Sequence, residues 1–230
     1  MKSSTKTAKL RLLSKPIPSD VGCHVCPMWV KGKRGVQWDG SLPNSAVPPA
    51  YEAPGGLMFV GEAPGGVEVD EGIPMVGPAG RIARAAIKTL KLPEPTITNT
   101  VLCRPMKGNA NRAPNDREMR ACSYWLEQAI AKAAPKVIVA MGNGACLSLL
   151  GREGIHALRG CIFRYKDYPI FVVPTWHPSY VMRAQHSEFL SVTVPSEFLT
   201  DLEMAKELMD YEVPANPAVT PDSPCPKQLS

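Results

Sequence analysis

Short apolar runs alternate with amphipathic segments through the middle of this 230-residue chain. Four of the runs predict buried strands, because each is rich in aliphatic, β-branched or aromatic residues and leads into glycine, proline or polar positions. The predicted strands cover residues 57–61, 97–102, 136–141 and 170–173. Runs that are apolar along most of their length are typical of a sheet that is covered on both faces.

Between these runs, apolar residues recur every three or four positions, which predicts helices. Predicted helices cover residues 80–92, 144–150 and 197–211, and another begins at Asn115 or Asp116, either of which can cap it. Strands that alternate with helices form a parallel sheet with helices on both sides. The pattern therefore predicts an α/β fold, and it contains no internal repeat.

Three of the four predicted strands lead into polar, glycine- or proline-rich turns, at residues 61–65, 99–105 and 175–179. Ligands in α/β proteins bind beyond the carboxyl ends of the strands, so candidate site residues are sought in these turns. Asn99 offers an amide that both donates and accepts, and His177 offers an imidazole. A structural role stays open for both, since a strand-end asparagine often caps a turn and a lone histidine is often structural.

Proline and polar residues fill both ends of the chain. Residues 1–20 show no hydrophobic period and residues 213–230 have the composition of a disordered tail. We therefore expect one domain over residues 21–212, between a flexible N-terminal segment and a disordered C-terminal tail. Residues 30–55 are rich in glycine and proline and predict a long loop within that domain.

Composition narrows the range of partners and compartments. A net charge of +5 permits a polyanionic partner without demanding one. No apolar run reaches the roughly 18 residues of a membrane helix, and the basic N-terminus lacks the apolar core of a secretory signal. We therefore expect an intracellular, cytoplasmic protein without a membrane partner, whose seven cysteines are thiols or metal ligands rather than disulfides.

Four of the cysteines form a pattern that is typical of a metal centre. Cys23 and Cys26 form a C-x-x-C pair, while Cys103 follows a predicted strand and Cys122 lies on the next predicted helix. Four thiolates suit zinc or a [4Fe–4S] cluster, and the spacing does not distinguish the two. The alternative is that Cys103 and Cys122 are small buried apolar residues.

The loop after the first strand combines flexibility with stiffness. Residues 61–65 read Gly-Glu-Ala-Pro-Gly, in which glycine lets the backbone approach a ligand and proline stiffens the turn. Residues 77–80 read Gly-Pro-Ala-Gly and open a helix whose first amides can hold an anion. A plain strand-to-helix connection remains the alternative for both stretches.

Four segments, taken in order and spacing, resemble the family 4 uracil-DNA glycosylases of the uracil-DNA glycosylase superfamily. They are GEAPGGVEVDEGIPMVGPAG, TNTVLCRP, KVIVAMGNGA and PTWHPSYVMR, and the resemblance covers about residues 20–212. It implies a three-layer α/β/α sandwich with a central four-stranded parallel sheet. It also implies a monofunctional DNA-repair glycosylase that hydrolyses the N-glycosidic bond of flipped-out uracil and leaves an abasic site.

The resemblance also implies a cofactor and a partner. The family binds a [4Fe–4S] cluster through four cysteines, which match Cys23, Cys26, Cys103 and Cys122 and favour iron–sulfur over zinc. The partner is uracil-containing DNA, and we expect the protein to act as a monomer.

The resemblance also implies catalytic roles for the residues at matching positions. His177 matches the histidine that donates to uracil O2, and Asn99 matches the residue that reads uracil through O4 and N3–H. Ala63 stands where the best-known members of the superfamily have an aspartate, so direct general-base help is weaker. Glu62 and Glu68 are the carboxylates we expect to position water, shape the pocket and balance positive charge.

The uracil pocket departs from the family at one position. Its lining is expected to include Asn99, Ala63 and Gly65, together with Met75, which replaces the usual aromatic residue that stacks on uracil. Methionine is adaptable but has no flat face. Two alternatives therefore stay open: a glycosylase for another modified pyrimidine or a deaminated purine, and a superfamily member that binds DNA without cleaving it.

Two further segments are candidates for contact with DNA. Residues 107–112 lie in a Cys103–Cys122 segment that is slightly longer than the family norm, and their polar, basic character suits DNA without resembling the loop that traps DNA covalently. The second segment matches the family's minor-groove loop. Its candidate DNA-binding residues are Ser179, Val181, Met182 and Arg183. The alternative for the two apolar ones is the core face of a helix that starts at Ser179.

Overall fold

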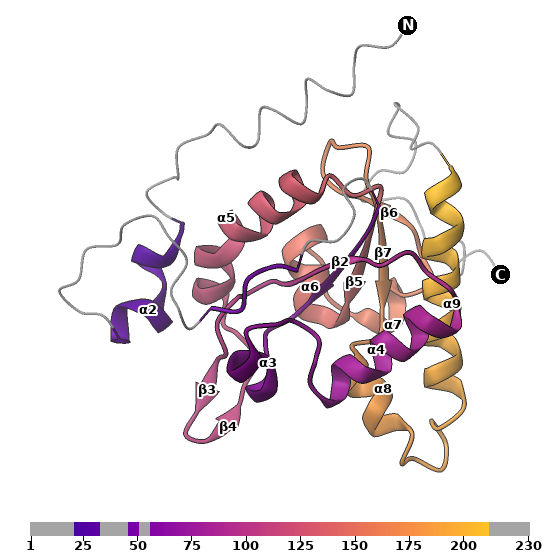
Figure 1. The fold of residues 1–230 in the computed structure, drawn as a ribbon, viewed down its shortest axis with the longest axis horizontal. Coiled ribbons are helices and arrows are strands. Elements are labelled where there is room, and N and C mark those ends of the chain that lie inside the picture. The colour runs from indigo at the N-terminus through magenta and orange to yellow at the C-terminus, as the bar shows by residue number, and fades with distance from the viewer. Residues whose placement is uncertain (1–20, 33–45, 51–55, 212–230) are drawn as a thin grey trace, which may run out of the picture.

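A computed structural model describes residues 21–32, 46–50 and 56–211 (Figure 1). The expected flexible N-terminal segment and disordered tail lie outside these described residues, as does most of the predicted 30–55 loop. The described residues form a central sheet flanked by helices, so the predicted α/β fold is confirmed.

Four parallel strands form the body of the sheet, in the order β2-β1-β5-β7. They correspond to the four predicted runs, and all residues of three of them are buried. A fifth strand, β6, pairs antiparallel with β7 at the edge and was not predicted, because two residues are too short to show a period. The strand bounds are β1 (Leu57–Gly61), β2 (Thr96–Asn99), β5 (Val137–Met141), β6 (Phe163–Arg164) and β7 (Phe171–Thr175).

Helices connect the parallel strands, and their bounds extend or trim the predicted ones by a few residues. No helix among the described residues is long and apolar enough to cross a membrane. The helices are η1 (Cys23–Val25), α2 (Pro27–Gly32), α3 (Gly66–Glu71), α4 (Pro78–Thr89), α5 (Asp116–Ala133), α6 (Gly142–Leu150), α7 (Ile155–Leu158), α8 (Pro178–Ala184), α9 (Thr193–Glu207) and η2 (Leu208–Asp210).

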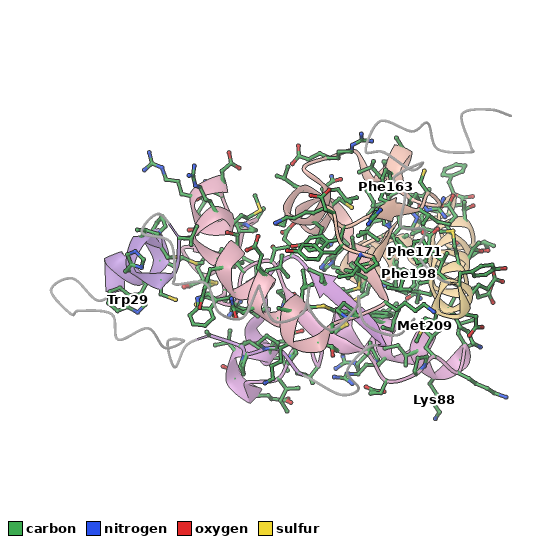
Figure 2. All side chains as sticks on the ribbon, turned by 90° about the horizontal axis from the view of Figure 1, so that it is seen from above. Trp29, Lys88, Phe163, Phe171, Phe198 and Met209 are labelled. Carbon is green, nitrogen blue, oxygen red and sulfur yellow. The ribbon has the colours of Figure 1, made fainter. Side chains whose placement is uncertain are left out.

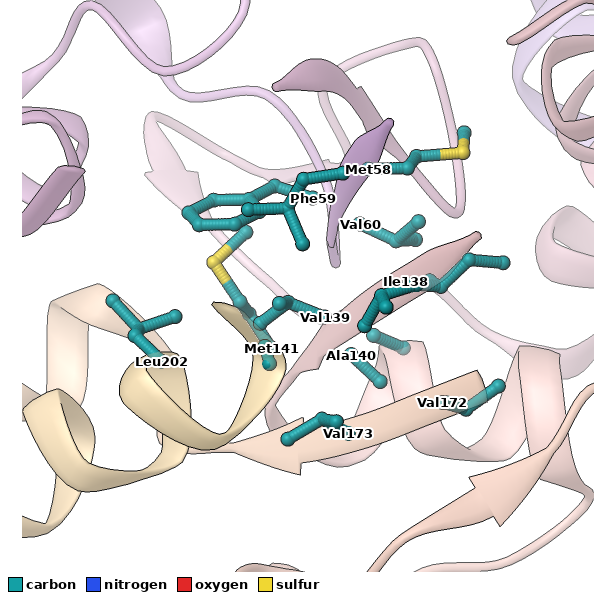
Figure 3. Packing of buried hydrophobic residues seen from close by; sticks show 14 of the residues in the cluster. Met58, Phe59, Val60, Ile138, Val139, Ala140, Met141, Val172, Val173 and Leu202 are labelled. Atoms are coloured by element: carbon teal, nitrogen blue, oxygen red, sulfur yellow. The ribbon is translucent and has the colours of Figure 1, made fainter. Parts of the chain in front are cut away.

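The helices cover the sheet on both faces. Helices α4, α8 and α9 pack on one face, while α5, α6 and α7 lie on the other (Figure 1). Side chains alternate between the faces along each strand: Phe59 and Met141 lie on the side of Leu202 from α9, and Met58 and Ile138 point to the opposite side (Figure 3). Helix α2, which carries Trp29, lies at the opposite end of the molecule from α9 (Figure 2).

Local contacts fix where α5 begins. The Asn115 side chain accepts a hydrogen bond from the Glu118 amide at 3.0 Å, and the Glu118 carboxylate accepts one from the Asn115 amide at 3.0 Å. This reciprocal capping box identifies Asn115 as the helix cap. Because Cys122 lies on the second turn of α5, the same cap also fixes the position of that cysteine.

The segment between Cys103 and α5 forms a small antiparallel hairpin, β3 (Met106–Lys107) with β4 (Ala110–Asn111). It is exposed, and Arg104 steadies it by donating from Nε to Asn111 Oδ1 at 2.6 Å. The hairpin, α3 and α8 all lie along the lower edge of the molecule in Figure 1. The segment between Cys103 and α5 therefore contains an exposed surface hairpin.

Candidate active site and cysteine cavity

Three predicted site residues lie at or just beyond the carboxyl ends of parallel strands. Asn99 is the last residue of β2, Glu62 directly follows β1, and His177 lies two residues beyond β7. Strands β1 and β2 are neighbours with Gly61 opposite Asn99, and β5 separates β1 from β7. The polar residues thus lie at one edge of the sheet, as the strand pattern predicted.

Glycines make room for these side chains. A Cβ atom on Gly61 would lie 2.4 Å from Asn99 Oδ1, and one on Gly142 would lie 2.9 Å from the His177 Cβ. Gly142 also has a φ of 83°, a conformation that favours glycine. Side chains at either glycine would displace the amide or the imidazole, so the sequence around the strand ends is constrained by close approach.

His177 is fixed in orientation and tautomer. It caps α8, and its Nδ1 accepts a hydrogen bond from the Ser179 backbone N–H at 3.2 Å, with the Ser179 hydroxyl 2.7 Å away. Because a backbone N–H can only donate, Nδ1 carries no proton and the neutral ring holds its proton on Nε2. Nothing in the described part of the chain accepts a hydrogen bond from that Nε2–H.

The His177 ring also stays neutral well below physiological pH. Burial lowers the pKa of His177 to about 4, with a smaller contribution from the positive charge of Arg183. Desolvation disfavours the charged form of a histidine, and a neighbouring cation acts in the same direction. The side chain is therefore a neutral N–H donor at the strand-end site.

Glu62 is half-buried beside the start of α6. A Cβ on Gly144 would lie 2.8 Å from the Glu62 carboxylate, so this glycine lets the side chain lie against the first turn of the helix. Burial raises the pKa of Glu62, and its carboxylate makes no hydrogen bond with the described residues. Glu62 is thus a carboxylate with free acceptor capacity.

Glu68 has a different environment. Its carboxylate accepts hydrogen bonds from the backbone amides of Gly65 at 3.0 Å and Gly77 at 3.2 Å. These bonds tie the loop after β1 to the residue that precedes α4. The contacts make Glu68 a brace between the loop after β1 and the start of α4.

The expected uracil-binding residues line the same loop and strand end. Asn99 is 8% exposed, and its amide makes no hydrogen bond within the described residues. Met75 is buried, with a φ of 62° that is unusual for a side-chain-bearing residue. Arg84 holds it there by donating from Nε to the Met75 carbonyl at 2.9 Å. Ala63 is half-buried in the turn beyond β1.

A cavity of about 360 Å³ lies at the strand ends beside Glu62 and His177. Glu62 and His177 line it, as do Ser179 and Arg183, whereas Asn99 and Met75 are not part of its lining. Sequence reasoning missed the other lining residues: Gly142, Asn143, Ile155, His156, Trp176 and Tyr180. The signal for the first two was present, because Gly142 and Asn143 follow the one strand end that was not among the three candidate turns.

The proposed DNA-contacting residues of α8 separate into two groups. Val181 is 1% exposed and belongs to the hydrophobic core, so the expected contact of Val181 with DNA is wrong for this position. Met182 is half-buried and Arg183 is exposed. The helical period accounts for the difference, since Val181 faces the core and its two neighbours do not.

The four patterned cysteines line a second cavity, of about 540 Å³. Burial raises the pKa of the Cys122 thiol, and the thiols of Cys103, Cys26 and Cys23 raise it further. Trp125 donates from Nε1 to the Cys23 Sγ at 3.3 Å. The topology has brought together two cysteines of the N-terminal segment, one strand-end cysteine and one on α5.

The size of this cavity bears on which metal centre fits. Zinc needs its four sulfurs about 2.3 Å from one point. Among the described residues, no three histidine, cysteine, aspartate or glutamate side chains are gathered in this way. A [4Fe–4S] cluster binds each cysteine through a different iron, so its four sulfurs stand farther apart. A cluster therefore needs a wider arrangement of the four cysteine sulfurs than zinc does.

Comparison with known proteins agrees with this geometry. The family model of the uracil DNA glycosylase superfamily matches residues 48–202. A Sulfurisphaera tokodaii protein is 34% identical over 169 residues, which are 69% of this chain and 70% of the relative. A Pyrobaculum aerophilum protein is 35% identical over 79% of this chain and 87% of the relative. A Thermotoga maritima protein is 31% identical over 83% of this chain and 91% of the relative.

All three relatives carry the name type-4 uracil-DNA glycosylase. The match of the family model covers the central sheet from before β1 into α9, and so includes Glu62, Asn99 and His177. The chain therefore belongs to the uracil DNA glycosylase superfamily, within its type-4 family.

Proposed function

We propose that this protein excises uracil from DNA by hydrolysing the glycosidic bond of a flipped-out deoxyuridine. The observation that carries the proposal is the neutral His177, whose Nε2–H is left unpaired at the strand-end site. Its relatives' name, type-4 uracil-DNA glycosylase, supports the same reaction.

The chemistry explains why a neutral donor is useful. Cleavage of the C1′–N1 bond leaves a positively charged, oxocarbenium-like sugar and a uracil anion whose charge is shared with O2. A donor that is already oriented before the reaction stabilises this developing charge without a reorganisation cost. We assign this role to His177 Nε2–H. The Ser179 backbone N–H holds the ring in the required tautomer.

Asn99 is assigned to base selection. Its amide is nearly buried and unpaired among the described residues, so it has both a donor and an acceptor to offer a ligand. Uracil presents an acceptor at O4 and a donor at N3–H. Cytosine reverses both groups, which leaves buried polar atoms without partners at about 1–3 kcal/mol each.

Glu62 is assigned to the attacking water and the sugar cation. When ionised, its carboxylate accepts a hydrogen bond from water and lies beside the site where positive charge develops. Ala63 supplies no second carboxylate in the turn, but an oxocarbenium ion reacts with a merely positioned water. Glu68 supports this arrangement indirectly by bracing the loop through Gly65 and Gly77.

We also propose that Cys23, Cys26, Cys103 and Cys122 hold a [4Fe–4S] cluster. The cavity that the four cysteines line and the membership of the type-4 family support this proposal. Bound there, the cluster supplies four cross-links that join the N-terminal segment to β2 and α5. The cysteines lie apart from the strand-end site, so the role we assign to the cluster is structural.

Contact with DNA is assigned to the exposed side of α8. Arg183 places a positive charge beside the cavity lined by His177, and the Ser179 hydroxyl lies at the same rim. Met182 is the apolar residue of this helix that is free to contact DNA. An apolar side chain can fill the space that a flipped nucleotide leaves in the duplex.

A steady-state assay with single- and double-stranded oligonucleotides tests the proposed reaction. One set contains uracil. Matched sets contain cytosine, thymine, a modified pyrimidine or the deaminated purine hypoxanthine at the same position. We expect excision of uracil and none of cytosine. Preference for a different base would assign Met75 to a changed specificity, and binding without any excision would identify a non-cleaving member.

Purified protein tests the cluster separately. We expect a brown protein with broad absorption at the blue end of the visible spectrum and about four irons per chain, since that is the cluster's composition. Replacement of Cys122 by serine should remove the colour, and the matched change Cys146→Ser should not, because Cys146 is a buried core residue outside the cavity. A colourless, zinc-loaded and fully active protein would contradict the assignment.

A further inference from the structure

The cavity beside His177 extends away from the residues assigned to uracil. Glu62 and His177 lie on its lining, but Asn99 and Met75 do not. Its remaining lining comes mainly from α6, α7 and α8. With the base on the Asn99 side and the reacting bond between Glu62 and His177, this part of the cavity lies beyond the reacting bond.

Three aromatic rings from separate segments form one side of this cavity. His156 of α7 meets Trp176 edge-on, with ring centres 4.7 Å apart and an interplanar angle of 78°. Trp176 in turn contacts Tyr180 of α8, at 4.9 Å and 42°. His156 is exposed and Tyr180 half-buried, while Trp176 is 5% exposed between them. We call these three residues the aromatic wall.

Polar contacts hold Trp176, the middle ring of the aromatic wall, in place. The Trp176 indole donates from Nε1 to Glu197 Oε2 at 2.8 Å, and the Arg159 guanidinium lies 5.8 Å from the centre of the Trp176 ring. Arg159 is itself fixed, because it donates to both carboxylate oxygens of the fully buried Asp201 at 3.0 and 3.2 Å. A ring held by this many contacts is a rigid surface that loses little freedom on binding.

We propose that the aromatic wall is a binding site for the nucleotide next to the excised one in the same DNA strand. Its base stacks on the accessible part of the wall at His156 and Tyr180, and its phosphate pairs with the exposed Arg183. Aromatic rings beside a cation are the usual combination for single-stranded nucleic acid, because every base has a π-face. This inference rests on the proposed function for the position of the excised nucleotide.

A binding experiment tests the wall without any need for excision. The probe is a short single-stranded oligonucleotide with tetrahydrofuran, an abasic analogue, at the position of the uracil. In two further probes, a second tetrahydrofuran replaces the base on the 5′ or the 3′ side. Loss of the stacked neighbour should weaken binding to the unaltered protein by roughly tenfold on one of the two sides.

The same probes are then bound to variants of the wall. In His156→Ala and in Tyr180→Leu, removal of that neighbouring base should change affinity by only about twofold. The variant has already lost the ring on which the base stacks, so little stacking energy is left to lose. His186→Ala is the matched control: His186 is also an exposed histidine but does not line the cavity, so it should behave as the unaltered protein. The proposal would be overturned if removal of the 5′ or the 3′ neighbouring base weakened binding equally in the unaltered protein and in both wall variants.

The outcome separates this inference from the proposed function. Uracil excision with no coupling between wall and base would refute the wall alone. Coupling in a protein that does not excise uracil would refute the proposed reaction and leave the wall as a nucleotide site. A loss of affinity that depends on Arg183→Ala and on no neighbouring base would identify a phosphate contact only, and would also overturn stacking.

Discussion

The strand-end site and the cysteine cavity are both assembled from residues far apart in the sequence, but the protein prepares them differently. At the strand ends, backbone amides orient His177 and Glu68, and glycines leave fitted spaces for Asn99 and Glu62. In the cysteine cavity, four thiols surround an open volume, and burial together with neighbouring thiols raises the pKa of Cys122 and of Cys23.

The difference indicates what each region needs in order to work. The strand-end site has its donors and acceptors in position from protein contacts alone, which is the arrangement expected where charge must be stabilised quickly. The cysteine cavity provides ligands whose charges require a metal centre to balance them. Changes at the first site should therefore alter rate or selectivity, and changes at the second should alter cofactor content and stability.

The largest effect is expected for His177→Ala. Loss of one preorganised donor to a developing anion typically lowers the rate by about 10²–10³-fold, while DNA binding changes little. Single-turnover excision and binding to abasic-analogue DNA measure the two quantities. His186→Ala serves as the control histidine. A parallel loss of rate and affinity would instead make His177 a ground-state contact or a structural residue.

The low pKa of His177 predicts a pH dependence of stability. The folded ring has a pKa of about 4, below the unfolded value of about 6.5, so the unfolded chain binds more protons between these values. This contribution is fully present above about pH 6.5 and is lost as the pH falls toward 4. Between about pH 7 and 5 the unaltered protein should lose about 2 kcal/mol relative to His177→Gln.

Urea unfolding of both proteins at the two pH values measures this difference. Because the two chains share every other titratable group, the comparison isolates the imidazole. The His177 donor should stay neutral down to about pH 5, so a fall in excision rate above that pH is expected to come from protonation of Glu62, whose pKa is raised by burial. Identical pH dependence of stability in the two proteins would show that the His177 ring is not held in its neutral form.

Asn99→Asp is expected to alter selectivity. A carboxylate keeps the size of the amide but removes the donor to uracil O4, a loss of about 1–3 kcal/mol. Uracil excision should fall by about tenfold or more, and discrimination against cytosine should shrink, without a change in thermal stability. A folded variant with unaltered rate and selectivity would remove Asn99 from base reading.

Periodicity and strand-end chemistry predicted much of this molecule. The four parallel strands, a cap of α5 at one of two adjacent residues and the placement of Asn99 and His177 at the same edge of the sheet follow from short-range patterns and from where parallel strands end. The two-residue strand β6 and the four-residue helix α7 were missed, since neither is long enough to show a period. The position of His156 depends on α7 packing against β7, which no local pattern reveals.

Short-range pattern also failed to predict which of Val181 and Met182 is buried. The sequence Pro-Ser-Tyr-Val-Met-Arg left open which apolar residue of α8 faces the core, because the helix is only seven residues long. Tertiary packing buries Val181 completely and leaves Met182 at the surface. Adjacent residues of similar character thus have opposite expected roles.

The smallest effects are expected on this exposed side of α8, and the two neighbours provide a matched pair. Val181→Ala should lower stability by about 2 kcal/mol and slow excision from single and double strands alike, because it opens the core. Met182→Ala should leave stability nearly unchanged and slow excision by a few fold from a stable duplex only, where unstacking has to be overcome.

Arg183→Ala should reduce the salt dependence of duplex binding by about one counterion. Thermal melts, paired excision assays on the two substrates and a salt titration measure these outcomes. If Met182→Ala destabilises the protein as much as Val181→Ala, or if the salt slope of Arg183→Ala is unchanged, α8 is not the element that contacts DNA.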